Sequence, residues 1–235
     1  GNGLMKLFIK GLILVASFVL AIFRPDFLTI VFTYKIFFFR FYHILWLLTV
    51  LILIKRLIPW FNPKITLGKI FKRNYIEAGE DNEKKREKLR AYKRRIDKGA
   101  IRSAVYWTFL VLDMGLWRLV GMLNDLWLFI VVIFFIFMDQ FCINVWCPFK
   151  TIIRQKCCNT CRINNWGYLM AFSPLIFLPS FWTYSILFLS VATIVQWEYL
   201  YYKHPERFYE LYNAALMCRN CVKKCSKMIS KNSFE

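Results

Sequence analysis

All eight cysteines of this 235-residue chain lie in its last hundred residues, on either side of one apolar stretch. Five precede residues 166–202 and three follow them. A C-x2-C spacing is typical of zinc and iron–sulfur sites, because two intervening residues allow a tight turn to aim both sulfurs at one metal. Cys158 with Cys161 and Cys218 with Cys221 have this spacing, so these four are the predicted metal ligands. The full set of candidate cofactor ligands is Cys142, Cys147, Cys157, Cys158, Cys161, Cys218, Cys221 and Cys225.

The number of cysteines helps to choose among the possible chemistries. One zinc ion takes four thiolates and leaves four of the eight cysteines unexplained. Two [4Fe–4S] clusters take all eight, so we expect [4Fe–4S] clusters, with structural zinc as the alternative. A third hypothesis is a thiol-dependent enzyme, in which one cysteine is a nucleophile or belongs to an exchanging pair. No catalytic residue is identified by the sequence.

The composition indicates that these cysteines belong to a membrane protein. Hydrophobic residues make up 58% of the chain, yet it also has 33 Lys and Arg against 14 Asp and Glu. The basic residues are segregated from apolar segments of about 20 residues, which is the pattern of a polytopic membrane protein. We therefore expect an all-α fold with about six transmembrane helices. The six predicted spans are residues 7–23, 28–54, 104–123, 126–146, 168–179 and 182–202.

The distribution of basic residues predicts the orientation of the spans. The connections within each predicted hairpin are short, whereas the other connections are long and hold 27 of the 33 basic residues. The positive-inside bias places those long connections, both termini and the cysteines on the cytoplasmic side of the cell membrane. Structural disulfides are rare in that compartment, and clustered cysteines there more often bind metal. The expected division is 1–54 and 103–146 as membrane segments, 55–102 as a basic loop, 147–165 as a cysteine-rich loop, 166–202 as a membrane hairpin and 203–235 as a cysteine-rich tail.

Two predicted spans and the basic loop have features of their own. Residues 28–54 are overlong, so crossing is expected only from about Phe41, and Pro174 and Pro179 make residues 168–179 a kinked or re-entrant segment. In the basic loop, Asp81 or Asn82 is expected to cap a helix with an apolar stripe. We interpret the loop as a solvated segment that fixes topology, with anionic lipid or an acidic partner protein as its alternative ligands. No motif for nucleic acid accompanies the charge. The predicted stripe consists of Leu89, Tyr92 and Ile96.

The segment 141–151, which reads FCINVWCPFKT, resembles the Cys-aromatic-Cys-Pro-Phe element of NapH/NosR-type membrane ferredoxins. In this chain four residues separate Cys142 from Cys147, where that element has three, and no complete C-x2-C-x2-C-x3-C-P repeat follows. The resemblance implies a multi-span oxidoreductase subunit that carries cubane clusters. It also implies that electrons pass between cytosolic donors, quinones and partner subunits in the membrane.

Charged residues inside the predicted spans are the second place where the sequence indicates function, because each is costly in hydrocarbon. Asp113 and Arg118 are expected to pair with each other, or with Lys35, Arg40 or His43 of the second span. We interpret them as an internal ion pair that locks the bundle, and a proton path or a quinone site is the alternative. Near the cytoplasmic boundary, Asp139, Gln140 and Glu198 are expected to pair with Lys or Arg of the loops.

Overall fold

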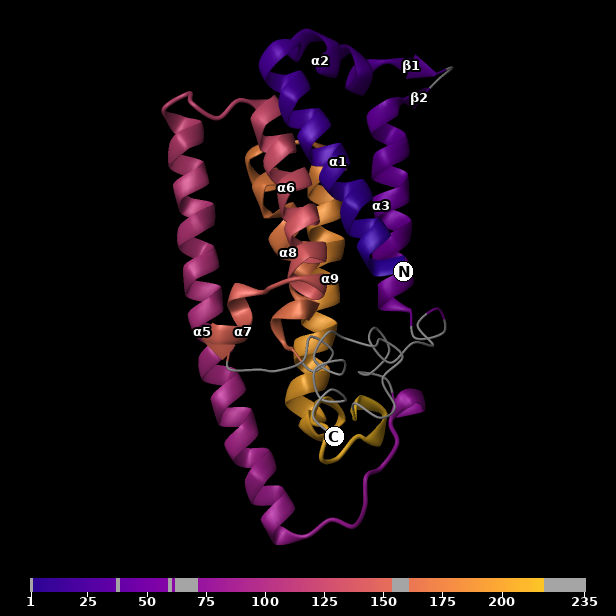
Figure 1. Cartoon of the computed structure of the whole chain (residues 1–235), viewed down its shortest axis with the longest axis vertical. Coiled ribbons are helices and arrows are strands. Elements are labelled where there is room, and N and C mark those ends of the chain that lie inside the picture. Colours follow the sequence, from indigo (N-terminus) through magenta and orange to yellow (C-terminus); the bar gives the residue numbers. More distant parts are fainter. Residues whose placement is uncertain (1, 37–38, 59–60, 62–71, 154–160, 218–235) are drawn as a thin grey trace, which may run out of the picture.

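The computed structural model describes residues 2–36, 39–58, 61, 72–153 and 161–217, and these form helices and one small ladder of two-residue strands. The long helices lie side by side as a bundle, and α5 extends well beyond it at one end (Figure 1). The 3₁₀ segments are η2 (Lys72–Asn74), η4 (Ile163–Asn165), η5 (Ser173–Phe177), η6 (Pro205–Phe208) and η7 (Ala214–Leu216). The other elements are α1 (Asn2–Phe23), α2 (Pro25–Thr33), β1 (Lys35–Ile36), β2 (Phe39–Arg40), α3 (Phe41–Leu57), α5 (Glu83–Leu119), α6 (Asp125–Asn144), α7 (Pro148–Ile153), α8 (Gly167–Phe172) and α9 (Phe181–Lys203).

Two helices, α1 and α6, are long and apolar enough to cross a membrane, over Gly3–Phe23 and Asp125–Asn144. They pack against each other, and Gly11 lies at their contact. A Cβ atom added at Gly11 of α1 would lie 3.3 Å from the Phe137 ring of α6. The all-helical prediction and the expectation of membrane helices are thus supported for the first and fourth predicted spans.

The other predicted spans are less regular, for reasons visible in their sequences. Residues 28–54 are divided among α2, the β1–β2 ladder and α3, and α3 begins at Phe41, where crossing was expected to begin. Residues 168–179 form α8 followed by the 3₁₀ segment η5, which has Pro174 in its first turn. Proline lacks the N–H that an α-helix needs at this position, so the predicted break is confirmed.

The predicted helix of the basic loop and the predicted third span form one helix, α5, of 37 residues. At 1.5 Å per residue its length is about 55 Å. The Asn82 side chain caps it by accepting a hydrogen bond of 2.9 Å from the Lys85 backbone N–H, as predicted. Tyr92 and Ile96 of the predicted stripe are buried, and Leu89 packs against the same cluster. The apolar stripe therefore fixes the N-terminal half of α5 to the bundle.

The two ends of the bundle differ in construction. At the upper end in Figure 1 the chain reverses between α1 and α2 and between α5 and α6, and we call this the short-turn end. Gly121, with φ of +76°, lies in the α5–α6 turn. At the opposite end, which we call the cysteine end, lie α7 and residues 204–217.

The surface of the bundle is apolar, while several of its buried side chains are polar. Ser103 of α5 and Ser190 of α9 have no exposed surface, whereas Phe188 of α9 is 73% exposed and Ile101 of α5 is 64% exposed. The two serine hydroxyls donate to carbonyl oxygens one turn earlier in their own helices, at 2.9 and 2.8 Å. Two small hydroxyl residues thus lie at helix contacts beside large buried apolar residues, and other large apolar residues face outward.

Candidate cysteine site

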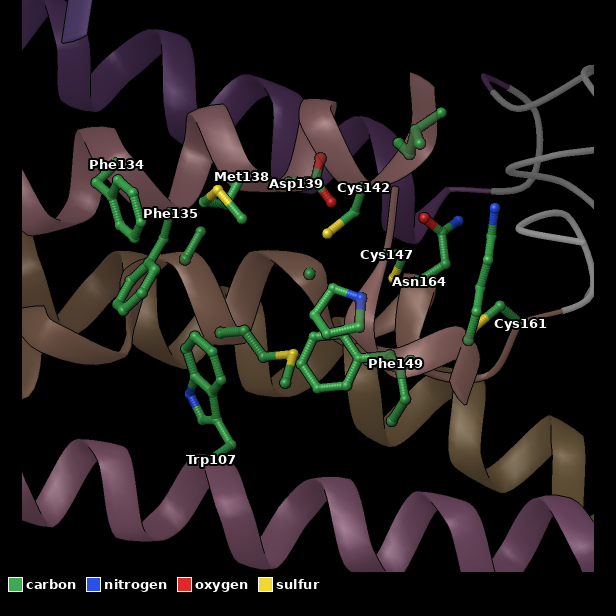
Figure 2. Close-up of a pocket in the computed structure, with 17 residues that line it drawn as sticks. Trp107, Phe134, Phe135, Met138, Asp139, Cys142, Cys147, Phe149, Cys161 and Asn164 are labelled. Carbon is green, nitrogen blue, oxygen red and sulfur yellow. The ribbon is translucent and has the colours of Figure 1, made fainter. Parts of the chain in front are cut away.

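Three cysteines line one pocket of about 190 Å³ at the cysteine end, between α5, α6, α7 and α8 (Figure 2). Cys142 lies in the last turn of α6, Cys147 in the turn before α7, and Cys161 just before η4. Cys147 and Cys161 are buried, and Cys142 is half-buried. Thirteen residues of the chain separate Cys147 from Cys161, so tertiary packing is what brings the third thiol to the pocket.

The position of Cys147 depends on how α7 packs against α5. Pro148 opens α7, a position that proline favours because its missing N–H has no partner there in any case. A Cβ atom at Gly99 of α5 would lie only 2.7 Å from the Cα atom of Ile153 in α7. Only glycine at residue 99 allows the two backbones this approach. Gly99 therefore permits α7, and with it the turn that carries Cys147, to pack against α5.

The pKa of the Cys147 thiol is strongly perturbed. A hydrogen bond from Cys142 is the main reason that the pKa of Cys147 falls to about 6, against the opposing effect of burial. Backbone hydrogen bonds from Phe149 and Lys150 and the charge of Lys150 lower this pKa further. The thiolate is the form of cysteine that binds metal or acts as a nucleophile, so Cys147 is prepared for either chemistry at neutral pH.

The rest of the pocket wall is largely apolar. The Trp107 ring packs on Phe135 with a centroid distance of 4.9 Å, and its indole N–H donates to the Ser173 hydroxyl at 3.2 Å. Asp139 lies close to the backbone of α8, since a Cβ atom at Gly167 would lie 2.7 Å from its carboxylate oxygen. Polar groups are confined to one part of the wall, and besides the thiols they are Asp139, Lys150 and Asn164.

A part-buried ion network follows Cys161 directly. The Arg162 guanidinium donates to both carboxylate oxygens of Glu198 on α9, with Nε distances of 3.1 and 3.0 Å. It also donates to Asp97 of α5 at 2.6 Å and lies 4.5 Å from the centre of the Tyr201 ring. The Trp166 indole N–H donates to Glu198 at 2.8 Å. Arg162 thus ties the segment that carries Cys161 to both α5 and α9.

The pairing of Glu198 with a basic loop residue is confirmed, and Arg162 is that residue. The contributions of Asp97, Trp166 and Tyr201 were not predicted. Their only sequence signal is that Glu198 and Tyr201 lie three residues apart on one face of α9. Asp97 lies 65 residues before Arg162, so no local pattern connects these two.

Most of the predicted metal ligands fall outside the described residues. This is true of Cys157, Cys158, Cys218, Cys221 and Cys225, so the predicted juxtaposition of the two C-x2-C pairs is not tested. Within the described parts of the chain, no group of three or more His, Cys, Asp or Glu side chains is arranged to hold a metal ion. Cys142, Cys147 and Cys161 share a pocket, but they do not form a metal site by themselves.

The predicted ion pair between Asp113 and Arg118 is wrong, because each side chain has another partner. Arg118 forms an ion pair with Asp125 across the α5–α6 turn and also donates to the Leu123 carbonyl oxygen at 3.0 Å. Asp113 accepts a hydrogen bond of 3.2 Å from the Trp117 indole N–H. The turn at Gly121 returns the chain towards Arg118, which brings Asp125 within its reach. Arg118 thus closes a turn instead of locking the interior of the bundle.

Comparison with known proteins found no relative: no protein-family model, no curated protein and no solved structure matches this chain.

Proposed function

We propose that this chain is a multi-pass integral membrane protein that binds an iron–sulfur cofactor at its cytosolic cysteine end. The cofactor relays electrons between a cytosolic donor and a membrane acceptor or partner subunit. The proposed spans are α1, α3, residues 104–119 of α5, α6, α8 with η5, and α9. Six spans return both termini to the side that carries most of the basic residues, which the positive-inside bias assigns to the cytosol.

The outward apolar surface supports the membrane assignment. A helical bundle in water places its apolar stripes inside and its polar residues outside. Here Phe188 and Ile101 face outward, while Ser103 and Ser190 are fully buried. Buried hydroxyl residues at some helix contacts, together with large apolar residues outside, are typical of helices packed in lipid. This pattern extends to α5 and α9, which are less apolar overall than α1 and α6.

The observation that carries the cofactor proposal is the meeting of Cys142, Cys147 and Cys161 at one pocket. The two segments that carry the other five cysteines directly adjoin described parts of the cysteine end. Residues 154–160 lie between α7 and Cys161, and residues 218–235 follow η7.

The three thiols of the pocket supply part of the ligand set of a thiolate-ligated cluster. A [4Fe–4S] cluster takes four thiolates, and the pocket offers three, so at least one ligand must come from Cys157, Cys158, Cys218, Cys221 or Cys225. The bound cluster would supply one-electron transfer. The Lys150 ammonium group would offset its negative charge, the aromatic walls would exclude water, and Arg162 would hold the segment of Cys161 in place.

Metal analysis of anaerobically purified protein tests this proposal. We expect iron and acid-labile sulfide in equal amounts and broad visible absorption near 400 nm. The double variant Cys158→Ser/Cys221→Ser should lose most of the iron, whereas the Arg118→Ala control at the short-turn end should keep it. A colourless preparation without iron would contradict the proposal. Stoichiometric zinc in that preparation would favour the structural zinc alternative.

A second candidate function, thiol–disulfide exchange, is favoured by the hydrogen bond between Cys142 and Cys147. In this reaction the two thiols become one disulfide, and a partner disulfide is reduced to two thiols. Treatment of metal-free protein with glutathione disulfide should then yield a peptide cross-linked through Cys142 and Cys147, together with two equivalents of glutathione. Its absence by mass spectrometry, with Cys161→Ser as the control variant, would exclude this function.

A further inference from the structure

Residues 83–102 of α5, which the proposed topology places in the cytosol, have charged side chains on two sides of the helix. The two sides differ in whether those charges form ion pairs within the chain. On one flank the charges are matched within the chain. Arg86 pairs with Asp81 at 2.8 Å, Arg90 pairs with Glu83 at 2.6 Å, and Asp97 pairs with Arg162. The exposed Arg94, four residues after Arg90, also lies on this side.

The other flank carries a continuous row of exposed cations, which we call the basic stripe. Its members follow one another at spacings of four, seven, three and four residues, so they lie along one side of the helix. The exposed Ala91 occupies the gap in the row, and one exposed acidic residue, Glu87, lies at its edge. No described acidic side chain forms an ion pair with any member. The stripe consists of Lys84, Lys88, Arg95, Lys98 and Arg102.

The direction of α5 separates most of the stripe from the membrane surface. If the protein spans the membrane as proposed, the exposed apolar part of α5 begins near Ile101, so Arg102 lies at the boundary. Lys84 is 17 residues before Ile101, which is about 26 Å along the helix. In Figure 1 this half of α5 extends below α3, α6 and α7, beside the end of α9 and residues 204–217. The Debye length at physiological ionic strength is about 8 Å, so lipid headgroups do not account for Lys84 and Lys88.

The side of α5 that faces the bundle packs against the buried cluster that contains Cys161. Tyr92, Ile96 and Ala100 belong to the same buried cluster as Cys161. A protein bound to the basic stripe would therefore be separated from these buried side chains by the width of one helix, which is about 10 Å. This is a suitable position for a molecule that exchanges electrons with the cysteine site.

We propose that the basic stripe is the docking surface for an acidic soluble protein, the redox partner of the cysteine site. The assignment of this partner as an electron carrier rests on the proposed function. If the cysteine end binds a cluster as proposed, the cluster would supply one-electron transfer, and the residues of the basic stripe would bind and orient the partner. Opposite charges across such an interface accelerate association, and they make the rate fall as salt rises.

Binding measurements on the full chain in phosphatidylcholine nanodiscs test the docking surface. The probe is a soluble acidic [2Fe–2S] ferredoxin, and the variant is Lys84→Glu/Lys88→Glu. The matched control is Arg24→Glu/Lys35→Glu, which makes the same change of charge at two exposed residues of the short-turn side. We expect the stripe variant to weaken binding at least tenfold, and the control to stay within twofold of wild type. Raising NaCl from 50 to 300 mM should weaken wild-type binding by a similar factor.

Three results would overturn the docking proposal. The first is wild-type protein that does not bind the ferredoxin, and the second is a stripe variant that binds it as tightly as wild type. The third is preferential binding of phosphatidylserine vesicles or poly(U) RNA that depends on Lys84 and Lys88. Metal content is measured on each sample, so iron-free protein that still binds the ferredoxin through the stripe would contradict the cofactor proposal and leave the docking surface intact.

Discussion

The two ends of the bundle meet the same requirement, reversal of the chain, in different ways. At the short-turn end, Gly121 and the exposed ion pair between Arg118 and Asp125 close the α5–α6 turn with a few residues. At the cysteine end, Arg162 is 83% buried by side-chain area and joins two helices through Glu198 and Asp97. The interactions at the short-turn end only reverse the direction of the chain between α5 and α6. Those at the cysteine end hold one particular segment, and that segment carries Cys161.

The difference between the two ends indicates that the ion network with a high desolvation cost lies next to a cysteine, whereas the exposed ion pair does not. A part-buried arginine with two carboxylates requires desolvation of all three groups, which gives little net stability unless the geometry is good. The matched fork of Arg162 and Glu198 provides that geometry. We interpret the network as a device that fixes the position of Cys161, and the following variants test whether the two ends differ in this way.

The largest expected effect is that of Arg162→Ala. Removing the guanidinium leaves Glu198 and Asp97 without their shared partner, which should lower the free energy of unfolding by about 2–3 kcal/mol after allowance for partial exposure. Thermal unfolding of the detergent-solubilised protein measures this loss. Cys161 should also react faster with maleimide. Arg162→Lys keeps the charge without the fork and should recover only part of the loss.

Gly99→Ala should have the next largest effect. Its Cβ atom would meet the Ile153 backbone at 2.7 Å, and relief of that clash moves α7 away from α5. We expect a loss of about 1–3 kcal/mol, as for other overpacked contacts, together with faster alkylation of Cys147. If alkylation of Cys147 stays at the wild-type rate, Gly99 does not position this turn.

Gly121→Ala provides the matching glycine test at the short-turn end. The positive φ of +76° disfavours any residue with a Cβ, so the expected loss is about 1 kcal/mol. No neighbouring atom lies within 4 Å of the added Cβ, so the turn should keep its shape. Alkylation rates of Cys147 and Cys161 should equal those of wild type. A faster rate would show that the two ends are coupled.

Arg118→Ala should have the smallest effect of the four. The Asp125 side chain is 66% exposed, and surface ion pairs of this kind contribute about 0.5 kcal/mol. Chemical unfolding with urea is suited to so small a difference. A loss as large as that of Arg162→Ala would contradict the distinction between the two ends.

Local features of the fold were predictable from the sequence because local residues determine them. Asn82 caps α5, Tyr92 and Ile96 form its buried stripe, and Pro174 breaks the segment after α8. The long apolar runs of α1 and α6 were recognisable by composition alone. The continuity of α5 was missed, because the change from a basic to an apolar surface near Ile101 suggested a boundary. Helix propensity and capping do not require one there.

For the candidate site, the sequence predicted which cysteines could take part, and it did not predict the residues that position them. The partners of Arg162 lie 65 residues before it and 36 residues after it, so a single sequence does not connect them. The pairing of Asp113 with Arg118 was predicted from their proximity in the chain, yet Asp125 reaches Arg118 through a turn whose geometry depends on Gly121. The pocket that Cys142 and Cys147 share with Cys161 required the packing of α7 against α5.

The most direct test of the central claim is X-ray absorption at the iron and zinc K-edges of one anaerobically prepared sample of the full chain. The proposal predicts an iron edge whose first coordination shell consists only of sulfur. In the Arg162→Ala variant this signal should weaken or broaden, whereas in Arg118→Ala it should be unchanged. A zinc edge with a sulfur shell near 2.3 Å, or no metal at either edge, would contradict the claim that the cysteine end binds an iron–sulfur cofactor.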